Sequence, residues 1–294
     1  MFKGLSAFPL TPFKEEHVDE HAFLALLGRL VEANVDSIGV LGSTGSYMYL
    51  SREERRRVIE LSVREAGTIP IMASISELRL RDVLALAEDA QQAGASAVLL
   101  APVSYQPLGE EEAYSLYEEV SRHASVPICV YDNPRTTRFT FSDELHGRIA
   151  ALPHVQSIKI PGVAADGIEA KEHIDRLRSV VPAKFALGIS GDDCAATGLT
   201  AGCDVWYSVL GGLFPRICLE LTRHAQARRA DEALRVSAQL APVWSLFKRY
   251  GSVRTAAAIA IRQGWMSAPG LPLPLAPVPA SEIGRIVDCL DALS

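Results

Sequence analysis

The feature that most constrains the fold of this chain is a strand-helix unit that repeats along it. Short apolar, β-branched runs recur at a spacing of roughly 30 residues, the size of one β-α-β unit. Between them lie amphipathic stretches, such as 23–31 and 83–90, with the spacing of a helix that buries one face. The segment Ser51-Arg-Glu-Glu54 predicts a capping box at the start of another helix. The predicted strands are Leu5–Phe8, Ser37–Leu41, Ile69–Ala73, Ala97–Ala101, Pro127–Tyr131, Val155–Lys159, Lys184–Gly188 and Asp204–Ser208.

Eight such units predict an α/β fold, a closed (β/α)8 TIM barrel with a C-terminal helical extension. The strands read as nearly continuous apolar runs, which parallel strands covered on both faces require. An open, doubly wound sheet is the competing architecture. We expect the catalytic barrel to occupy residues 1–224 and the helical extension residues 225–294. Within the extension, the proline-rich segment 269–279 is interpreted as an extended strap that crosses the barrel surface before a last helix.

The composition argues against several classes of function. Acidic residues outnumber basic ones by 35 to 29, so the chain lacks the basic field that nucleic-acid binding needs. No stretch approaches the roughly 18 apolar residues of a membrane span, and the N-terminus does not resemble a signal peptide. The five cysteines include no Cys-x-x-Cys pair, which argues against a disulfide framework and a zinc ribbon. We therefore expect a cytoplasmic enzyme with small-molecule substrates and no nucleic-acid or membrane partner.

A lysine closes the otherwise apolar sixth strand of the predicted barrel. On a protein surface, Lys159 would be a snorkelling side chain. In the mouth of a barrel, the apolar walls disfavour the ammonium form, and a neutral amine can attack a ketone to form a Schiff base. Tyr131 closes the preceding strand and would stand close to Lys159, where a phenol can carry protons. Its alternative interpretation is a tyrosine that caps the core with its hydroxyl group in water.

Two further strand ends carry polar groups. The loop Gly42-Ser-Thr-Gly45 offers hydroxyl groups and backbone amides that could hold a carboxylate, although such loops are also ordinary turns. Asp192 and Asp193 could bond substrate hydroxyl groups, or they could cap the next helix. No histidine falls at the carboxyl end of a predicted strand, so we predict no catalytic metal.

Three motifs together resemble the dihydrodipicolinate synthase/N-acetylneuraminate lyase family across essentially the whole chain. They are Gly42-Ser-Thr-Gly45, Tyr131-x-x-Pro134 and Ser157-Ile-Lys159, in the right order and on the right strands. The resemblance implies a (β/α)8 barrel with a helical extension, usually a homotetramer, that acts on pyruvate or another 2-keto acid through a lysine Schiff base without a cofactor. It implies that Lys159 is the Schiff-base lysine and Tyr131 the proton shuttle. It also implies that Ser43 and Thr44 bind the keto-acid carboxylate.

The sequence also departs from both branches of that family. The second tyrosine of the synthase, which reaches across a subunit interface, falls on Ser104, with Tyr105 beside it. The synthase arginine that grips the semialdehyde carboxylate falls on Thr136, and Arg135 stands one place earlier. The Asp192-Asp193 pair falls where the lyase presents acidic groups to sugar hydroxyls. We therefore count Ser104, Tyr105, Arg135, Asp192 and Asp193, besides Ser43 and Thr44, as candidate substrate-binding residues.

The expected function is a Schiff-base-forming lyase or aldolase, similar to dihydrodipicolinate synthase, that acts on a 2-keto acid and an unassigned aldehyde. Three alternatives stay open on the sequence. The chain could be a genuine 4-hydroxy-tetrahydrodipicolinate synthase, or a dehydratase of a sugar acid or keto acid within the same family. It could also be a non-catalytic keto-acid sensor. We expect a homotetramer or a homodimer.

Overall fold

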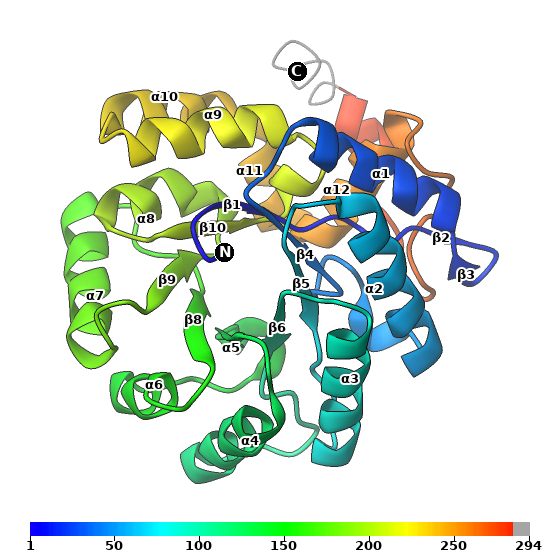
Figure 1. Cartoon of the computed structure of the whole chain (residues 1–294). Coiled ribbons are helices and arrows are strands. Elements are labelled where there is room, and N and C mark those ends of the chain that lie inside the picture. The colour runs from blue at the N-terminus through cyan, green and yellow to red at the C-terminus, as the bar shows by residue number, and fades with distance from the viewer. Residues whose placement is uncertain (285–294) are drawn as a thin grey trace.

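The fold is a closed barrel of eight parallel strands, seen in a computed structural model that describes residues 1–284 (Figure 1). Around the ring the strands follow the order β1-β10-β9-β8-β7-β6-β5-β4, and β4 pairs with β1 to close it. The barrel strands are β1 (Gly4–Ala7), β4 (Ser37–Val40), β5 (Ile71–Ser74), β6 (Ala97–Leu100), β7 (Ile128–Tyr131), β8 (Val155–Ile160), β9 (Ala186–Ile189) and β10 (Val205–Ser208). All eight predicted strands are present, which excludes the open sheet.

Most of the helices that follow barrel strands form an outer ring around those strands (Figure 1). Three short 3-10 helices stand in loops that follow barrel strands: η1 (Tyr47–Tyr49), η2 (Asp192–Cys194) and η3 (Leu210–Gly212). The helices associated with the barrel are α1 (Glu20–Glu32), α2 (Arg52–Ala66), α3 (Leu80–Gln92), α4 (Glu110–His123), α5 (Pro134–Thr137), α6 (Asp143–Ala150), α7 (Gly167–Val180), α8 (Ala195–Ala201) and α9 (Pro215–Gln226). The predicted capping box opens α2: Ser51 Oγ accepts from the Glu54 amide, and the Glu54 carboxylate accepts from the Ser51 amide.

The C-terminal extension is helical, as predicted. It comprises α10 (Ala230–Gln239), α11 (Ala241–Tyr250) and α12 (Ser252–Arg262). The division at residue 224 stays a prediction, and it falls within the last turn of α9. Residues 271–279 form neither helix nor strand, and Arg254 Nη1 ties this strap to α12 by donating to the Ala276 carbonyl at 2.7 Å. Residues 280–284 are helical, and the rest of the predicted last helix lies outside the described residues.

One element had no counterpart in the sequence analysis. The chain between β1 and α1 forms a two-stranded antiparallel hairpin, β2 (Phe13–Lys14) and β3 (His17–Val18). Phe13 also bridges to Gly270 at the start of the strap. No helix in the described part of the chain is both long enough and apolar enough to cross a membrane.

Alternation along β7 and β8 decides which side chains enter the barrel. Val130 and Ile158 face outward and join the large core between the strands and the helices. Tyr131 is part of a second, inner cluster with Phe8 and Tyr207. Lys159 follows Ile158 on the opposite face of β8 and therefore points into the barrel with Tyr131.

Two glycines leave room for the aromatic rings beneath the lysine. A Cβ atom on Gly39 of β4 would lie 2.3 Å from the ring of Phe8, and a Cβ atom on Gly188 of β9 would lie 2.2 Å from the ring of Tyr207. Such contacts are far below van der Waals distance, so any larger residue would displace these rings. The two glycines thereby shape the apolar floor of the barrel mouth.

Candidate active site

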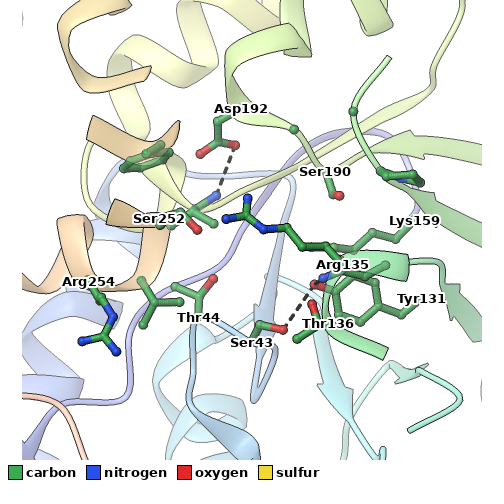
Figure 2. A pocket seen from close by; sticks show the side chains of 18 of the residues that line it. Ser43, Thr44, Tyr131, Arg135, Thr136, Lys159, Ser190, Asp192, Ser252 and Arg254 are labelled. Atoms are coloured by element: carbon green, nitrogen blue, oxygen red, sulfur yellow. Dashed lines mark hydrogen bonds between the residues drawn. The ribbon is translucent and has the colours of Figure 1, made fainter. Parts of the chain in front are cut away.

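The candidate site is a cavity of about 690 Å³ that lies at the carboxyl ends of the barrel strands. Figure 2 shows Lys159, Tyr131, Ser43 and Thr44 lining it. In a (β/α)8 barrel this is the end of the strands where catalytic groups collect. The structure thus brings together the lysine, the tyrosine and the hydroxyl-bearing loop that the sequence indicated.

Aromatic faces surround the amine of Lys159. Its Nζ lies 4.2 Å from the ring centroid of Phe8, 4.7 Å from that of Tyr131 and 5.7 Å from that of Tyr207. The side chain is buried, and within residues 1–284 no carboxylate forms an ion pair with it. No salt bridge therefore has to break before the amine attacks a carbonyl carbon.

The hydroxyl group of Tyr131 has two polar neighbours. It lies 3.3 Å from Ser43 Oγ, which follows β4, and it accepts a hydrogen bond of 2.8 Å from Asn133 Nδ2. The backbone also couples the two candidate catalytic strands, because the Asp132 amide donates to the Lys159 carbonyl at 3.0 Å. The phenol is therefore held at the barrel mouth from both sides.

The loop after β4 is held in an uncommon conformation. Leu41 and Ser46 both adopt positive φ angles, of 58° and 53°. A Cβ atom on Gly45 would lie 2.9 Å from the Leu41 amide nitrogen, so the tight return of the loop requires glycine there. This backbone presents Ser43 and Thr44 to the cavity.

A buried cysteine inside the barrel is unreactive at neutral pH. Cys129 lies in the inner cluster, and burial raises the pKa of its thiol to about 11. Its Sγ donates to the hydroxyl group of Tyr207 at 3.4 Å. The protonated thiol does not compete with the amine at neutral pH.

The acidic pair after β9 divides between two environments. Asp192 is buried, and its carboxylate accepts from Trp206 Nε1 at 2.8 Å, from the Leu210 amide at 2.8 Å and from the Val209 amide at 3.3 Å. Burial raises the pKa of Asp192 to about 6, against the opposing effect of these donors. Asp193 forms an ion pair of 2.9 Å with Lys248 of α11. Both residues line the cavity, but their carboxylates have partners within the chain.

Arg135 differs from these paired residues. Its side chain extends from α5 across the cavity toward Ser252 and Asp192 (Figure 2). Over residues 1–284 its guanidinium makes no ion pair and no hydrogen bond. The side chains that carry charge in the lining are Lys159, Arg135, Lys248, Arg254, Asp192 and Asp193. Even without Lys159, three cations stand against two carboxylates, which favours a substrate with negative charge.

Two candidate residues lie away from the cavity of their own chain. Ser104 and Tyr105 follow β6 and do not line the cavity, and Tyr105 is 90% exposed. These residues could therefore contribute to a substrate-binding site only if that site belonged to a second subunit.

Other lining residues were missed by the sequence analysis. Asn133 and Ser190 stand at the ends of β7 and β9, positions where polar residues could have been singled out. The segment where α11 meets α12 has no sequence feature that marks it as part of the site. It lies over the barrel mouth only because of the tertiary structure. This segment contributes Phe247, Lys248, Tyr250, Gly251, Ser252, Val253 and Arg254.

Comparisons with known proteins agree with this geometry. Residues 1–293 match the model of the dihydrodipicolinate synthetase family. A 4-hydroxy-tetrahydrodipicolinate synthase from Brucella abortus is 30% identical over 250 residues, which cover 83% of this chain and 82% of that protein.

Two solved structures extend the likeness to the whole fold. The crystal structure of a dihydrodipicolinate synthase from Agrobacterium tumefaciens is 48% identical, with a TM-score of 0.95 over 100% of this chain and 98% of that one. A chloride-inhibited dihydrodipicolinate synthase from Acinetobacter baumannii, complexed with pyruvate, is 25% identical, with a TM-score of 0.88 over 99% and 98% of the two chains.

These likenesses confirm the reaction class that the motifs predicted, a Schiff-base-forming lyase of the class I aldolase type. The agreement covers the fold and essentially the full length of the sequence. The chain belongs to the dihydrodipicolinate synthetase family.

Proposed function

We propose that this enzyme joins a 2-keto acid to an aldehyde, or cleaves such a product, through a Schiff base on Lys159. Pyruvate is the first choice of keto acid. The observation that carries the proposal is the position of the Lys159 amine, which lies in an aromatic-walled mouth beside the phenol of Tyr131. The pyruvate bound to the Acinetobacter baumannii relative supports the choice of keto acid.

The proposed reaction begins when Lys159 Nζ attacks the keto carbon to form a carbinolamine. Tyr131 gives its proton to the carbinolamine hydroxyl group, water leaves with the bonding pair, and the nitrogen lone pair forms the C=N bond. Ser43 and Thr44 hold the keto-acid carboxylate during these steps. The Tyr131 phenolate then takes a proton from the neighbouring carbon, and the C–H bonding pair forms the C=C bond of an enamine as the C=N pair returns to nitrogen. The enamine is the nucleophile that adds to an aldehyde.

The second substrate is proposed to carry an anionic group at the end distant from the aldehyde. The Arg135 guanidinium, which has no partner among residues 1–284, supports this assignment because its side chain extends across the cavity (Figure 2). Asp192 and Asp193 are less suited to bind hydroxyl groups of a sugar, because their carboxylates are already bonded within the chain. A carboxylated aldehyde therefore fits the cavity better than a neutral sugar.

The second candidate is a genuine 4-hydroxy-tetrahydrodipicolinate synthase. The similarity to synthases from Brucella abortus and Agrobacterium tumefaciens favours it. The serine at position 104, where the synthase has its second tyrosine, speaks for a site whose second half differs from that enzyme. Turnover of pyruvate with aspartate semialdehyde separates this candidate from an aldolase with another carboxylated aldehyde.

We also propose that the enzyme works as a homodimer or homotetramer in a reducing compartment such as the cytoplasm. Large apolar side chains are exposed on the loops and helix starts that follow the adjacent strands β4, β5 and β6: Met48, Tyr49, Leu78, Leu80 and Tyr105. Two of these, Met48 and Tyr49, also line the cavity, so the patch is continuous with its rim. A second copy of this chain is the proposed occupant. The four described cysteines are free thiols, which suits a reducing compartment.

Exchange of the pyruvate methyl protons tests the proposed activity without knowledge of the second substrate. Reversible enamine formation in D2O replaces these protons by deuterium, and proton NMR follows the loss of the methyl signal. We expect exchange with the wild type and none with Lys159→Ala. A sensor that only binds the keto acid would perturb the pyruvate signal without exchanging it, and that outcome would overturn the proposal.

A further inference from the structure

We infer that Asn133 is a positioning residue that fixes the hydroxyl group of the catalytic phenol, Tyr131. The inference rests on the proposed role of Tyr131 and adds to it a residue whose task is to orient that group. Asn133 Nδ2 donates to the Tyr131 hydroxyl oxygen at 2.8 Å, shorter than the 3.3 Å that separates this oxygen from Ser43 Oγ.

The local backbone shows that Asn133 is not needed as a helix cap. It occupies the N-cap position of α5, where an asparagine side chain normally accepts from a backbone amide of the first turn. Here its side chain makes no cap hydrogen bond. The amide group is turned to the phenol instead.

The main chain holds Asn133 firmly enough to orient another group. Its carbonyl oxygen accepts from the amides of Thr136 and Thr137, each at 3.0 Å, and from Thr137 Oγ1 at 3.0 Å. Pro134, at the first position of α5, restricts the backbone that follows. The side chain therefore projects from a fixed point at the carboxyl end of β7.

The chemistry of an amide defines what this contact can do. An amide group neither gains nor loses a proton near neutral pH, so Asn133 takes no part in a proton relay. Because its N–H donates to the phenol oxygen, the phenol's own hydrogen points elsewhere, toward Ser43 or the bound carbinolamine. When Tyr131 gives that proton to the departing hydroxyl group, the resulting phenolate keeps the donor. Hydrogen bonds to charged groups are stronger than neutral ones, so the contact favours the proton transfer.

The same contact gives the Tyr131 hydroxyl group a partner within its own chain. Ser104 and Tyr105 lie outside the cavity, and within residues 1–284 the recorded side-chain partners of the Tyr131 hydroxyl group are Ser43 and Asn133. Asn133 supplies orientation and Ser43 supplies a hydroxyl group that can pass a proton. Each chain thereby holds its own phenol in place.

Asn133→Asp is the sharpest test, because it keeps the shape of the side chain and removes the N–H donor. Asn34→Asp is the matched control, the same chemical change at an exposed position after α1. We expect Asn133→Asp to slow imine formation with pyruvate about 10- to 100-fold at saturating substrate, with a small change in KM. We expect Asn34→Asp to leave both quantities unchanged.

A double-mutant cycle with Tyr131→Phe shows whether Asn133 acts through the phenol. Single-turnover imine formation, trapped with borohydride and measured by intact mass, supplies the rates. If Asn133 works through the Tyr131 oxygen, Asn133→Asp has no further effect once that oxygen is gone. The inference is overturned if the fold-decreases in rate of the two single substitutions multiply in the double variant.

A second readout is independent of activity. In protein labelled with 13Cζ-tyrosine, the resonance that disappears in Tyr131→Phe is that of Tyr131. This resonance should shift in Asn133→Asp and stay in place in Asn34→Asp. A resonance that does not move in Asn133→Asp would refute the contact, whether or not the enzyme forms an imine with pyruvate. A wild-type enzyme that forms no imine would overturn the proposed function alone.

Discussion

Tyr131 and Lys159 are direct partners in the parallel pairing of β7 with β8. Paired residues of neighbouring strands point to the same face of a sheet, so both side chains enter the barrel side by side. The phenol is thereby placed next to the amine by strand register alone. Part of this relationship is visible in the sequence, because Tyr131 is the last residue of β7 and Lys159 is the last but one of β8.

Replacement of Tyr131 by phenylalanine should slow imine formation and leave the fold intact. The ring remains in the inner cluster with Phe8 and Tyr207, while the hydroxyl group that we propose as the proton donor is lost. One general acid-base group contributes roughly 10²–10⁴-fold, and we expect the single-turnover rate to fall within that range. An unchanged rate would move the proton transfer to another group, with Tyr105 of a second subunit the next residue to replace.

Arg135 should determine a preference for aldehydes that carry a carboxylate. We expect Arg135→Gln to raise KM about 10- to 100-fold for succinic semialdehyde and much less for propanal. Arg138→Gln is the matched control, because Arg138 is the C-cap residue of the same helix, α5, and does not line the cavity. Equal changes for both aldehydes, or for both variants, would remove Arg135 from substrate binding.

The buried carboxyl group of Asp192 should make the stability of the protein depend on pH in an unusual direction. Burial raises its pKa from 3.8 to about 6, so between these values the folded state holds a proton that the unfolded state has released. The stability that this group contributes therefore falls as pH rises through that window. A pKa difference of this size between the folded and unfolded states corresponds to roughly 3 kcal/mol in the free energy of unfolding.

Asp192→Asn cannot titrate and provides the reference. The free energy of unfolding of the wild type minus that of the variant should decrease by up to roughly 3 kcal/mol between about pH 4 and pH 7. Urea denaturation at several pH values measures this difference. A constant difference across the range would show that Asp192 has an ordinary pKa in the folded protein.

The exposed apolar patch around Tyr105 should hold subunits together. Tyr105→Glu places a charge in this patch, and we expect analytical ultracentrifugation to show a smaller particle than the wild type. Leu234→Glu on α10 is the control, an exposed apolar residue outside the patch, and should leave the particle size unchanged. The proposed interface is wrong if Tyr105→Glu does not alter the particle.

Much of the barrel could be predicted because its signals are local. Each barrel strand is a short apolar run, and the capping box at Ser51 marks where α2 begins. The hairpin β2–β3 could not be predicted in this way. Its strands are two residues long, too short for alternation to appear, and Phe13 is held by a contact with the distant Gly270.

In the candidate site, too, some residues have a local signal in the sequence and others depend on tertiary structure. Lys159 and Tyr131 stand out because a polar residue at or next to the end of an apolar strand is unusual and can be seen in the local sequence. The partners of Asp192 are Trp206 and two backbone amides, and no sequence pattern announces them. The turn of Asn133 toward the phenol, in place of an ordinary helix cap, likewise depends on tertiary structure.

Borohydride trapping with pyruvate, followed by intact mass and peptide mapping, tests the central claim most directly. Reduction turns an imine into a stable amine, so the adduct stays on the residue that formed it. We predict one adduct per chain, located on Lys159 and absent from Lys159→Ala. An adduct on another lysine, an adduct that persists in Lys159→Ala, or no adduct with pyruvate and larger 2-keto acids would contradict the proposed mechanism.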